Sequence, residues 1–188
     1  MYIVIEGIDT AGKSTQLDIL KQNNPTAIFT KEPGGTKIGL ELRRMVLNGE
    51  AKSNIAEMFL FLADRAEHIE EIIKPNINNM VISDRSMISG IAYASNLPLE
   101  IVTTLNLIAT NNLLPTHVIL LELSKEELIS RLSQKEHDNI ESRGIEYLLD
   151  IQKRMKHTIE LLKINHLFID ASLSIEEIAK RIKDFINE

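Results

Sequence analysis

Two glycines, a lysine and a serine near the amino terminus have the spacing of a loop that holds phosphate groups. Gly7 and Gly12 are separated by four residues, and Lys13 and Ser14 follow directly. Glycines let consecutive backbone N–H groups curl around phosphate oxygens, and the lysine adds a positive charge. We therefore expect a nucleoside triphosphate to bind to the residues of this loop, namely Gly7, Ile8, Asp9, Thr10, Ala11, Gly12, Lys13, Ser14 and Thr15.

An aspartate and an arginine, Asp84 and Arg85, directly follow a short apolar run at residues 80–83. A carboxylate at the end of a buried strand can hold Mg²⁺ and its waters, and an arginine beside it can face a phosphate. Buried strands rarely end in two charged residues for structural reasons alone. A hydroxyl that follows the lysine of a phosphate-binding loop can also ligate Mg²⁺. We predict that Ser14 and Asp84 are the magnesium ligands.

Three further segments supply candidates for a second substrate. Phe61 and Arg65 lie four residues apart and share a helix face, where a ring and a guanidinium suit a flat base with a polar edge. Arg43 follows a tight turn at residues 33–35. A polar stretch between two helices, about residues 134–144, is typical of a lid that brings cations to phosphates. The plainer alternatives are that Phe61 belongs to the core, that Arg43 is a solvated charge and that the lid is a solvated loop.

Short apolar runs alternate with longer amphipathic ones along the chain. We expect strands at residues 2–6, 26–30, 80–83, 116–123 and 166–170, and helices at 13–22, 36–48, 54–74, 98–112, 124–135, 145–164 and 174–188. Apolar strands separated by helices form parallel sheets that are covered on both faces. We therefore predict a three-layer α/β fold of about five parallel strands, in which ligands bind at the carboxyl ends of the strands. No segment has the composition of a linker, so we expect one domain at residues 1–188 with the lid inside it.

Composition argues against several other classes of protein. The chain has no cysteine, and its scattered histidines lack metal-site spacing, so we expect neither a disulfide nor a zinc site. A net charge of −6 argues against a nucleic-acid partner. No apolar run approaches the ~18 residues of a membrane span, and the amino terminus lacks the features of a signal peptide. We expect a cytoplasmic protein without a membrane partner.

Together, these motifs resemble the thymidylate kinase family, whose members convert dTMP to dTDP with ATP. The resemblance follows the chain in order through IEGIDTAGKST, KEPGGTKIG with a later LR, FLFLADRAEH, ISDRSMISGIAYA and the lid. The first motif is common to many families, but the combination of E-P-G-G, F-x-x-x-R and D-R-S-x-x-S-G-x-A-Y is specific. The resemblance implies a P-loop NTPase fold with ATP as the phosphoryl donor, Mg²⁺ as the cofactor and dTMP as the acceptor.

The resemblance also implies roles for the matching residues. Asp9 would contact the 3′-hydroxyl of the acceptor sugar, and Arg43 and Arg85 would hold the dTMP phosphate. Phe61 would stack on thymine, and Arg65 would bond to its carbonyl edge. The remaining acceptor contacts would come from Glu32, Pro33, Ser89 and Tyr93. The catalytic residues would be Asp9, Lys13, Arg85 and Lys135.

The chain departs from the family pattern at two points that bear on function. The usual D-R-x-E of the lid appears as Asp138-Asn139-Ile140-Glu141, so Arg131 and Arg143 remain alternatives to Lys135 as the catalytic cation. A glutamine often found after the tyrosine is Ala94 here, which leaves selectivity between dTMP and dUMP open. Members are usually dimers, and apolar helices surround Phe59 and Leu107, so we expect a homodimer.

Two other functions fit part of the pattern. A deoxynucleoside kinase shares the phosphate loop and a D-R-S stretch, but that class carries a tryptophan after the second strand, and this chain has none. An ATP-dependent switch or binding protein needs no acceptor pocket, so it would leave Phe61, Arg65 and Arg85 unexplained.

Overall fold

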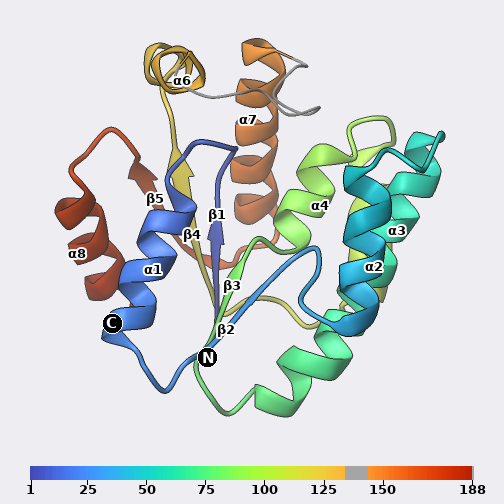
Figure 1. Cartoon of the computed structure of the whole chain (residues 1–188), viewed down its shortest axis with the longest axis horizontal. Helices are drawn as coiled ribbons and strands as arrows, with labels where there is room; N and C mark the ends of the chain where they lie inside the picture. Colours follow the sequence, from blue (N-terminus) through green and yellow to red (C-terminus); the bar gives the residue numbers. More distant parts are fainter. Residues whose placement is uncertain (134–143, 188) are drawn as a thin grey trace.

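A five-stranded parallel sheet forms the centre of the computed structural model, which describes residues 1–133 and 144–187. The order of the strands is β2-β3-β1-β4-β5, and helices cover both faces of the sheet (Figure 1). The strands are β1 (Tyr2–Glu6), β2 (Ile28–Lys31), β3 (Val81–Asp84), β4 (His117–Glu122) and β5 (Asn165–Asp170). The predicted α/β fold with five parallel strands is confirmed.

The order of the strands fixes where a ligand can bind. β1 pairs with β3 on one side and with β4 on the other; the chain runs from β1 to the edge strand β2, returns to β3 and then crosses to β4 and β5 on the other side. Loops that leave the carboxyl ends of β1 and its neighbours therefore diverge to opposite faces and open a crevice between them. The predicted phosphate loop leaves β1 at this point, and Asp84 ends β3 beside it.

Eight α-helices connect or flank the strands within the described residues. They are α1 (Lys13–Asn23), α2 (Lys37–Leu47), α3 (Asn54–His68), α4 (Met87–Tyr93), α5 (Leu99–Ala109), α6 (Lys125–Leu132), α7 (Ile145–Leu161) and α8 (Ile175–Ile186). Figure 1 shows α1 and α8 on one side of the sheet and α2, α3, α4 and α7 on the other. Ser124 caps the start of α6, because its hydroxyl accepts a hydrogen bond from the Glu127 N–H at 3.2 Å.

The long helix after the second strand ends earlier than the sequence pattern indicates. We expected an end near Lys74, but α3 ends at His68. The chain then passes through a π-helical turn, Ile69–Ile73, and a 3₁₀ turn, Lys74–Asn76, that contains Pro75. The π turn keeps Ile69 and Ile73 buried, so the apolar spacing continues while the hydrogen-bonding pattern changes.

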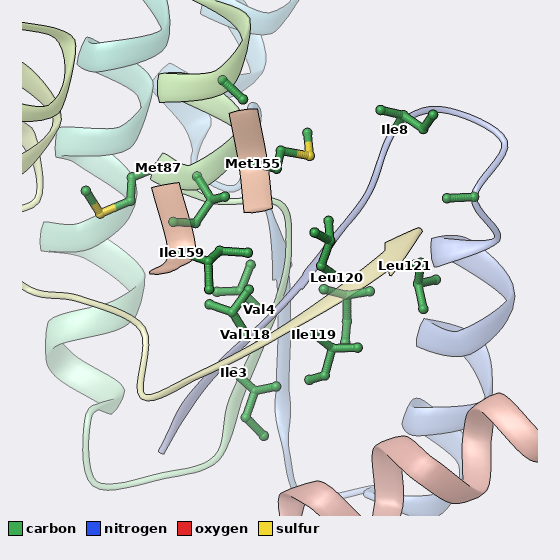
Figure 2. Close-up of a cluster of buried hydrophobic side chains, with 14 of the residues drawn as sticks. Ile3, Val4, Ile8, Met87, Val118, Ile119, Leu120, Leu121, Met155 and Ile159 are labelled. Atoms are coloured by element: carbon green, nitrogen blue, oxygen red, sulfur yellow. The ribbon is translucent and has the colours of Figure 1, made fainter. Parts of the chain in front are cut away.

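The core lies against both faces of the central strands. Every residue of β1 is buried, as the near-continuous apolar sequence predicts for a strand that is covered on both sides. Figure 2 shows Val4 and Val118 on the side of Met155 and Ile159 from α7, whereas Leu121 lies on the side of α1. Complete burial of such side chains contributes about 1.5–3 kcal/mol each. No helix among the described residues has both the length and the apolar character to cross a membrane.

Candidate functional site

A cavity of about 230 Å³ opens at the carboxyl end of the sheet, between the loop after β1 and the helices α2 to α5. Its lining includes every residue that we predicted for the acceptor, namely Asp9, Glu32, Pro33, Arg43, Phe61, Arg65, Arg85, Ser89 and Tyr93. These residues come from four separate stretches of the chain. The structure therefore brings together in one place residues that the sequence connects only through their motifs.

The loop between β1 and α1 has the backbone shape that phosphate binding requires. Gly12 has φ +93 and Thr10 has φ +68, in the left-handed region. A Cβ atom on Gly7 would lie 2.9 Å from the carbonyl oxygen of Leu121, so only glycine fits there. The first turn of α1 begins directly at Lys13 and points its free N–H groups toward the loop.

Lys13 is buried beneath the loop that it would serve. Its Nζ donates hydrogen bonds to the carbonyl oxygens of Gly7, at 2.9 Å, and Ile8, at 3.2 Å. Burial lowers the pKa of Lys13 to about 8, and the charge of Arg85 acts in the same direction. A phosphate placed in the loop would supply the negative charge that favours the protonated lysine.

An ion pair joins the phosphate loop to the cavity. Arg85 donates from Nη2 to Asp9 Oδ1 at 2.5 Å and from Nη1 to Ser89 Oγ at 3.0 Å. Its guanidinium carbon lies 5.7 Å from the centre of the Tyr93 ring. Arg85 has φ +70, a conformation that is uncommon for a residue with a side chain and is often found at functional sites. Asp9 therefore holds the Arg85 side chain at the border between the loop and the cavity.

Glu6 is a buried carboxylate at the site that sequence analysis missed. Its oxygens accept hydrogen bonds from Ser86 Oγ at 2.8 Å, Ser89 Oγ at 2.6 Å and the Ser89 N–H at 3.2 Å. Burial raises the pKa of Glu6, although nearby Arg85 and the serine hydroxyls oppose that shift. A charged residue at the end of an apolar strand, directly before Gly7, was the available signal. Glu6 fixes the start of α4, whose first turn Ser86 caps.

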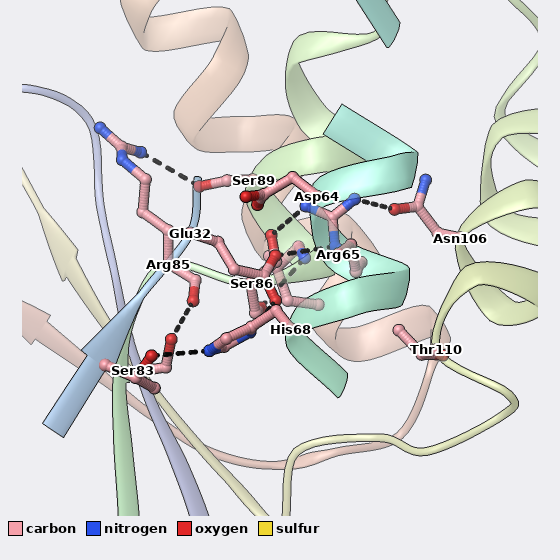
Figure 3. A network of polar contacts seen from close by, with 12 residues as sticks. Glu32, Asp64, Arg65, His68, Ser83, Arg85, Ser86, Ser89, Asn106 and Thr110 are labelled. Carbon is pink, nitrogen blue, oxygen red and sulfur yellow. Dashed lines mark hydrogen bonds and ion pairs between the residues drawn. The ribbon is translucent and has the colours of Figure 1, made fainter. Parts of the chain in front are cut away.

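A second polar cluster forms the far wall of the cavity (Figure 3). The guanidinium of Arg65 donates from Nε to Glu32 Oε2 at 2.8 Å, from Nη1 to Asn106 Oδ1 at 2.6 Å and from Nη2 to the Ser86 carbonyl at 3.2 Å. The other oxygen of Glu32 lies 2.8 Å from His68 Nδ1. The turn after β2, α3, the start of α4 and α5 therefore meet at the buried guanidinium of Arg65.

The electrostatics of this cluster favour a charged pair. Burial alone would raise the pKa of Glu32, but the charge of Arg65 and the contact with His68 outweigh it and lower the pKa. Only 3% of each side chain, Glu32 and Arg65, is exposed. Removing one partner would leave the other as an uncompensated buried charge.

Phe61 and Arg43 complete the cavity wall. Phe61 is half-buried, lies one helical turn before Arg65 and lines the cavity, so its ring is open to a ligand there rather than sealed in the core.

Arg43 donates from Nη1 to the carbonyl oxygen of Pro33 at 3.0 Å, so the turn after β2 positions its side chain. A Cβ atom on Gly34, which has φ +97, would approach Arg43 Cδ to 2.9 Å. The alternative of a freely solvated Arg43 is not favoured.

Asp84 and Ser14, the residues predicted to bind Mg²⁺, are suited to an ion that takes only one or two ligands from the protein. Asp84 Oδ1 is buried without a hydrogen-bond partner among the described residues, and Ser14 is exposed in the first turn of α1. The described residues include no cluster of three or more potential metal-ligating side chains. Magnesium at nucleotide sites takes one or two protein ligands and completes its shell with phosphate oxygens and water. Asp84 and Ser14 are suited to that arrangement.

The predicted lid lies largely outside the described residues, and with it Lys135 and Arg143. Arg131, the remaining alternative for the catalytic cation, lies in α6. It donates from Nη1 to the Thr10 carbonyl at 3.0 Å and from Nη2 to the Ala171 carbonyl at 2.6 Å. Arg131 therefore connects the phosphate loop to the segment after β5.

Comparisons with known proteins agree in one family. The family model described as thymidylate kinase matches residues 5–182. A thymidylate kinase of Aliarcobacter butzleri is 69% identical over 187 residues, which cover 100% of this chain and 99% of that protein. A thymidylate kinase of Wolinella succinogenes is 57% identical over 182 residues, with 97% and 96% of the two chains covered.

A solved structure shares the fold. The crystal structure of thymidylate kinase from Ehrlichia chaffeensis superposes with a TM-score of 0.80 and covers 100% of this chain and 98% of its own. Its sequence identity is 21%, so the likeness concerns the arrangement of strands and helices.

We predict that Glu32→Gln destabilises the fold by about 3 kcal/mol, because it leaves the buried Arg65 charge without compensation. Urea denaturation of the wild type and the variant measures the difference. The matched control is Glu41→Gln, which removes an exposed partner of Arg44 at 3.3 Å and should change stability by less than about 1 kcal/mol. Equal losses in the two variants would contradict a charged Glu32–Arg65 pair.

Proposed function

The chain belongs to the thymidylate kinase family, and we propose that it transfers the γ-phosphate of ATP to dTMP, giving dTDP and ADP. It is thus a phosphotransferase. The observation that carries the proposal is the cavity beside the phosphate loop, because its lining holds all nine residues predicted for the acceptor. A donor loop and an acceptor cavity that share Asp9 and Arg85 suit transfer between two bound substrates.

ATP binds, in this proposal, with its phosphates in the loop from Gly7 to Thr15. The loop N–H groups and the start of α1 hold the phosphate oxygens, and Lys13 adds its charge. Ser14 and Asp84 are the residues that would hold Mg²⁺, which neutralises charge on the phosphates when bound. The buried Oδ1 atom of Asp84, without a partner among the described residues, supports this assignment.

dTMP binds in the cavity with its phosphate toward the loop and its base toward α3. Arg85 and Arg43 hold the phosphate, Phe61 stacks on the base and Arg65 donates to the carbonyl edge of the base. Asp9 accepts a hydrogen bond from the 3′-hydroxyl of the sugar. The other contacts with the sugar and the base come from the remaining lining residues Glu32, Pro33, Ser89 and Tyr93.

Catalysis in this arrangement consists of positioning and charge stabilisation. An oxygen of the dTMP phosphate attacks the γ-phosphorus in line, and the bond to the β-phosphate oxygen breaks, so no covalent enzyme intermediate forms. Lys13 and Arg85 stabilise the charge on the transferring group. We propose that the lid, about residues 134–144, supplies a further cation through Lys135 and keeps water from the phosphates.

The two other functions are less well supported. A deoxynucleoside kinase would need the acid after β2 as a base, but both oxygens of Glu32 are engaged by Arg65 and His68. A nucleotide-dependent switch has no use for a cavity lined by Phe61, Arg43 and Arg65.

A coupled assay of ADP release with a panel of acceptors tests the proposed reaction. We expect turnover with dTMP and none above background with thymidine, because Arg43 and Arg85 need an acceptor phosphate to bind. Turnover with thymidine alone would support a deoxynucleoside kinase instead. ATP binding without turnover on any nucleotide would support a switch protein.

Asp9→Asn should lower kcat by about one to two orders of magnitude while the KM for ATP changes less than about threefold. The variant keeps the shape of the side chain but removes the charge that holds Arg85 at 2.5 Å. Asp18→Asn is the control, since Asp18 is an exposed residue of α1 that pairs with Lys21 at 3.8 Å. A matching loss of ATP affinity in Asp9→Asn would mean that Asp9 serves only the phosphate loop.

We also propose that residues 1–188 form one domain and that the protein acts in the cytoplasm.

We further propose that two copies of the chain form a homodimer through α2, α3 and α5. α3 packs against both α2 and α5, and the three helices expose large apolar side chains at Leu40, Leu47, Phe59, Ile101 and Ile108. Apolar side chains exposed together on adjacent elements are typical of an interface. Sedimentation equilibrium should report twice the chain mass, and a monomer at all concentrations would contradict the dimer.

A further inference from the structure

We propose that Asn106 of α5 determines which base the cavity accepts, because it holds Arg65 in place and its own side-chain oxygen is engaged by Arg65, so that only N–H donors of this pair can face the base. The inference rests on the proposed function and adds to it a residue outside every motif that the sequence analysis singled out. Asn106 is 1% exposed, yet it lines the same cavity as Arg65. The base that fits such a wall is a pyrimidine with an oxygen, not an amino group, at position 4.

The direction of the Arg65 guanidinium is set from three sides. Glu32 holds Nε, Asn106 holds Nη1 and the Ser86 carbonyl holds Nη2. These partners belong to the turn after β2, to α5 and to the start of α4. Because the guanidinium is planar and rigid, three fixed contacts leave it one orientation (Figure 3).

The groups left over at this wall are all donors. Arginine has five N–H groups, so three contacts leave two without a partner among the described residues. The Asn106 side-chain amide donates one hydrogen to the Val102 carbonyl at 2.8 Å and has a second one, while its oxygen already accepts from Arg65. Both oxygens of Glu32 are likewise occupied. The groups of Arg65, Asn106 and Glu32 that remain without a partner here are therefore N–H donors.

A donor-only wall selects by hydrogen-bond polarity. The 4-oxygen of thymine can accept from these N–H groups, whereas the 4-amino group of cytosine would bring its own donors against them. Buried donors that face donors stay unpaired, and an enzyme discriminates strongly against a substrate that leaves its buried polar groups unpaired. The structure thus assigns rejection of dCMP to Arg65 and Asn106 as a unit.

Gly90 of α4 lies close against the same guanidinium. A Cβ atom on Gly90 would lie 2.6 Å from Arg65 Nη1 and 2.8 Å from Nη2. Gly90 lies inside α4 and has an ordinary helical backbone, where alanine is otherwise favourable. Gly90→Ala should therefore move the guanidinium without removing any of its partners.

A purely structural role for Asn106 predicts different kinetics. In that case Asn106 joins α5 to α3, and its loss would lower stability and affect both substrates alike. Selection of the base through Arg65 predicts instead that the acceptor is affected while ATP is not. The ratio of kcat/KM for dTMP to that for dCMP separates the two roles, because a general loss of folded enzyme cancels in it.

The experiment measures this ratio, the KM for ATP and thermal stability in four variants of the full chain. Asn106→Leu removes one of the three partners of Arg65. Asn106→Asp keeps an acceptor for Arg65 but replaces the free amide donor. Gly90→Ala displaces the guanidinium. We expect each of these to lower the dTMP to dCMP ratio about tenfold or more, with Asn106→Asp gaining activity on dCMP. Thr110→Val is the control, because its buried hydroxyl donates to the Leu107 carbonyl and none of its hydrogen bonds reaches Arg65.

An unchanged ratio in both Asn106 variants and in Gly90→Ala would overturn the inference, and so would a wild-type enzyme that uses dCMP as well as dTMP. Equal rises in the KM for dTMP and for ATP would also overturn it, because they would show that Asn106 acts only through the fold. Absence of wild-type turnover on dTMP would instead refute the proposed function itself. The two failures are therefore distinguishable.

Discussion

A buried guanidinium, that of Arg65, holds together one wall of the cavity. Arg65 is 3% exposed, and a charge in that position is stable only if opposite charge and hydrogen bonds surround it. Glu32 supplies the charge, and Asn106 and the Ser86 carbonyl supply further acceptors. The turn after β2, the start of α4 and the second half of α5 must all be in place for this compensation. The need to satisfy one charge thus shapes one wall of the cavity.

The loop after β1, which we predict to hold phosphate, depends on backbone shape rather than on a buried ion pair. Gly7 and Gly12 allow the loop after β1 to close tightly over Lys13, and the parallel sheet places Asp84 beside that loop. The ion pair of Arg85 with Asp9 then connects this loop to the cavity. Asp9 belongs to the loop after β1 and Arg85 follows β3, so this single contact joins two segments that are 76 positions apart in the sequence.

The sequence alone was sufficient for the fold and for naming residues that the structure gathers around one cavity. Apolar runs of strand length located all five strands, and the predicted phosphate-binding segment with Gly7, Gly12 and Lys13 lies where β1 passes into α1. The i, i+4 relation of Phe61 and Arg65 placed both on one helix face, and the structure puts both on the cavity wall. Local spacing is informative in these cases because the function depends on residues that are close in sequence.

The residues that sequence analysis missed act through distant partners. Asn106 meets Arg65 across 41 positions, and Glu6 meets Ser89 across 83, so no local pattern connects either pair. Asn106 has the sequence appearance of a polar residue in an amphipathic helix, and only the packing of α5 against α3 brings it to Arg65. The early end of α3 was missed for a related reason, since a π turn keeps apolar residues buried while the hydrogen bonds change.

A crystal structure of the protein with dTMP bound would test the proposed acceptor site most directly. We expect the base beside Phe61, with its 4-oxygen within hydrogen-bonding distance of Arg65, and the phosphate beside Arg85 and Arg43. A nucleotide in the reverse orientation, with its phosphate at Arg65, would contradict the proposed site. So would dTMP bound outside the cavity while the cavity stays open.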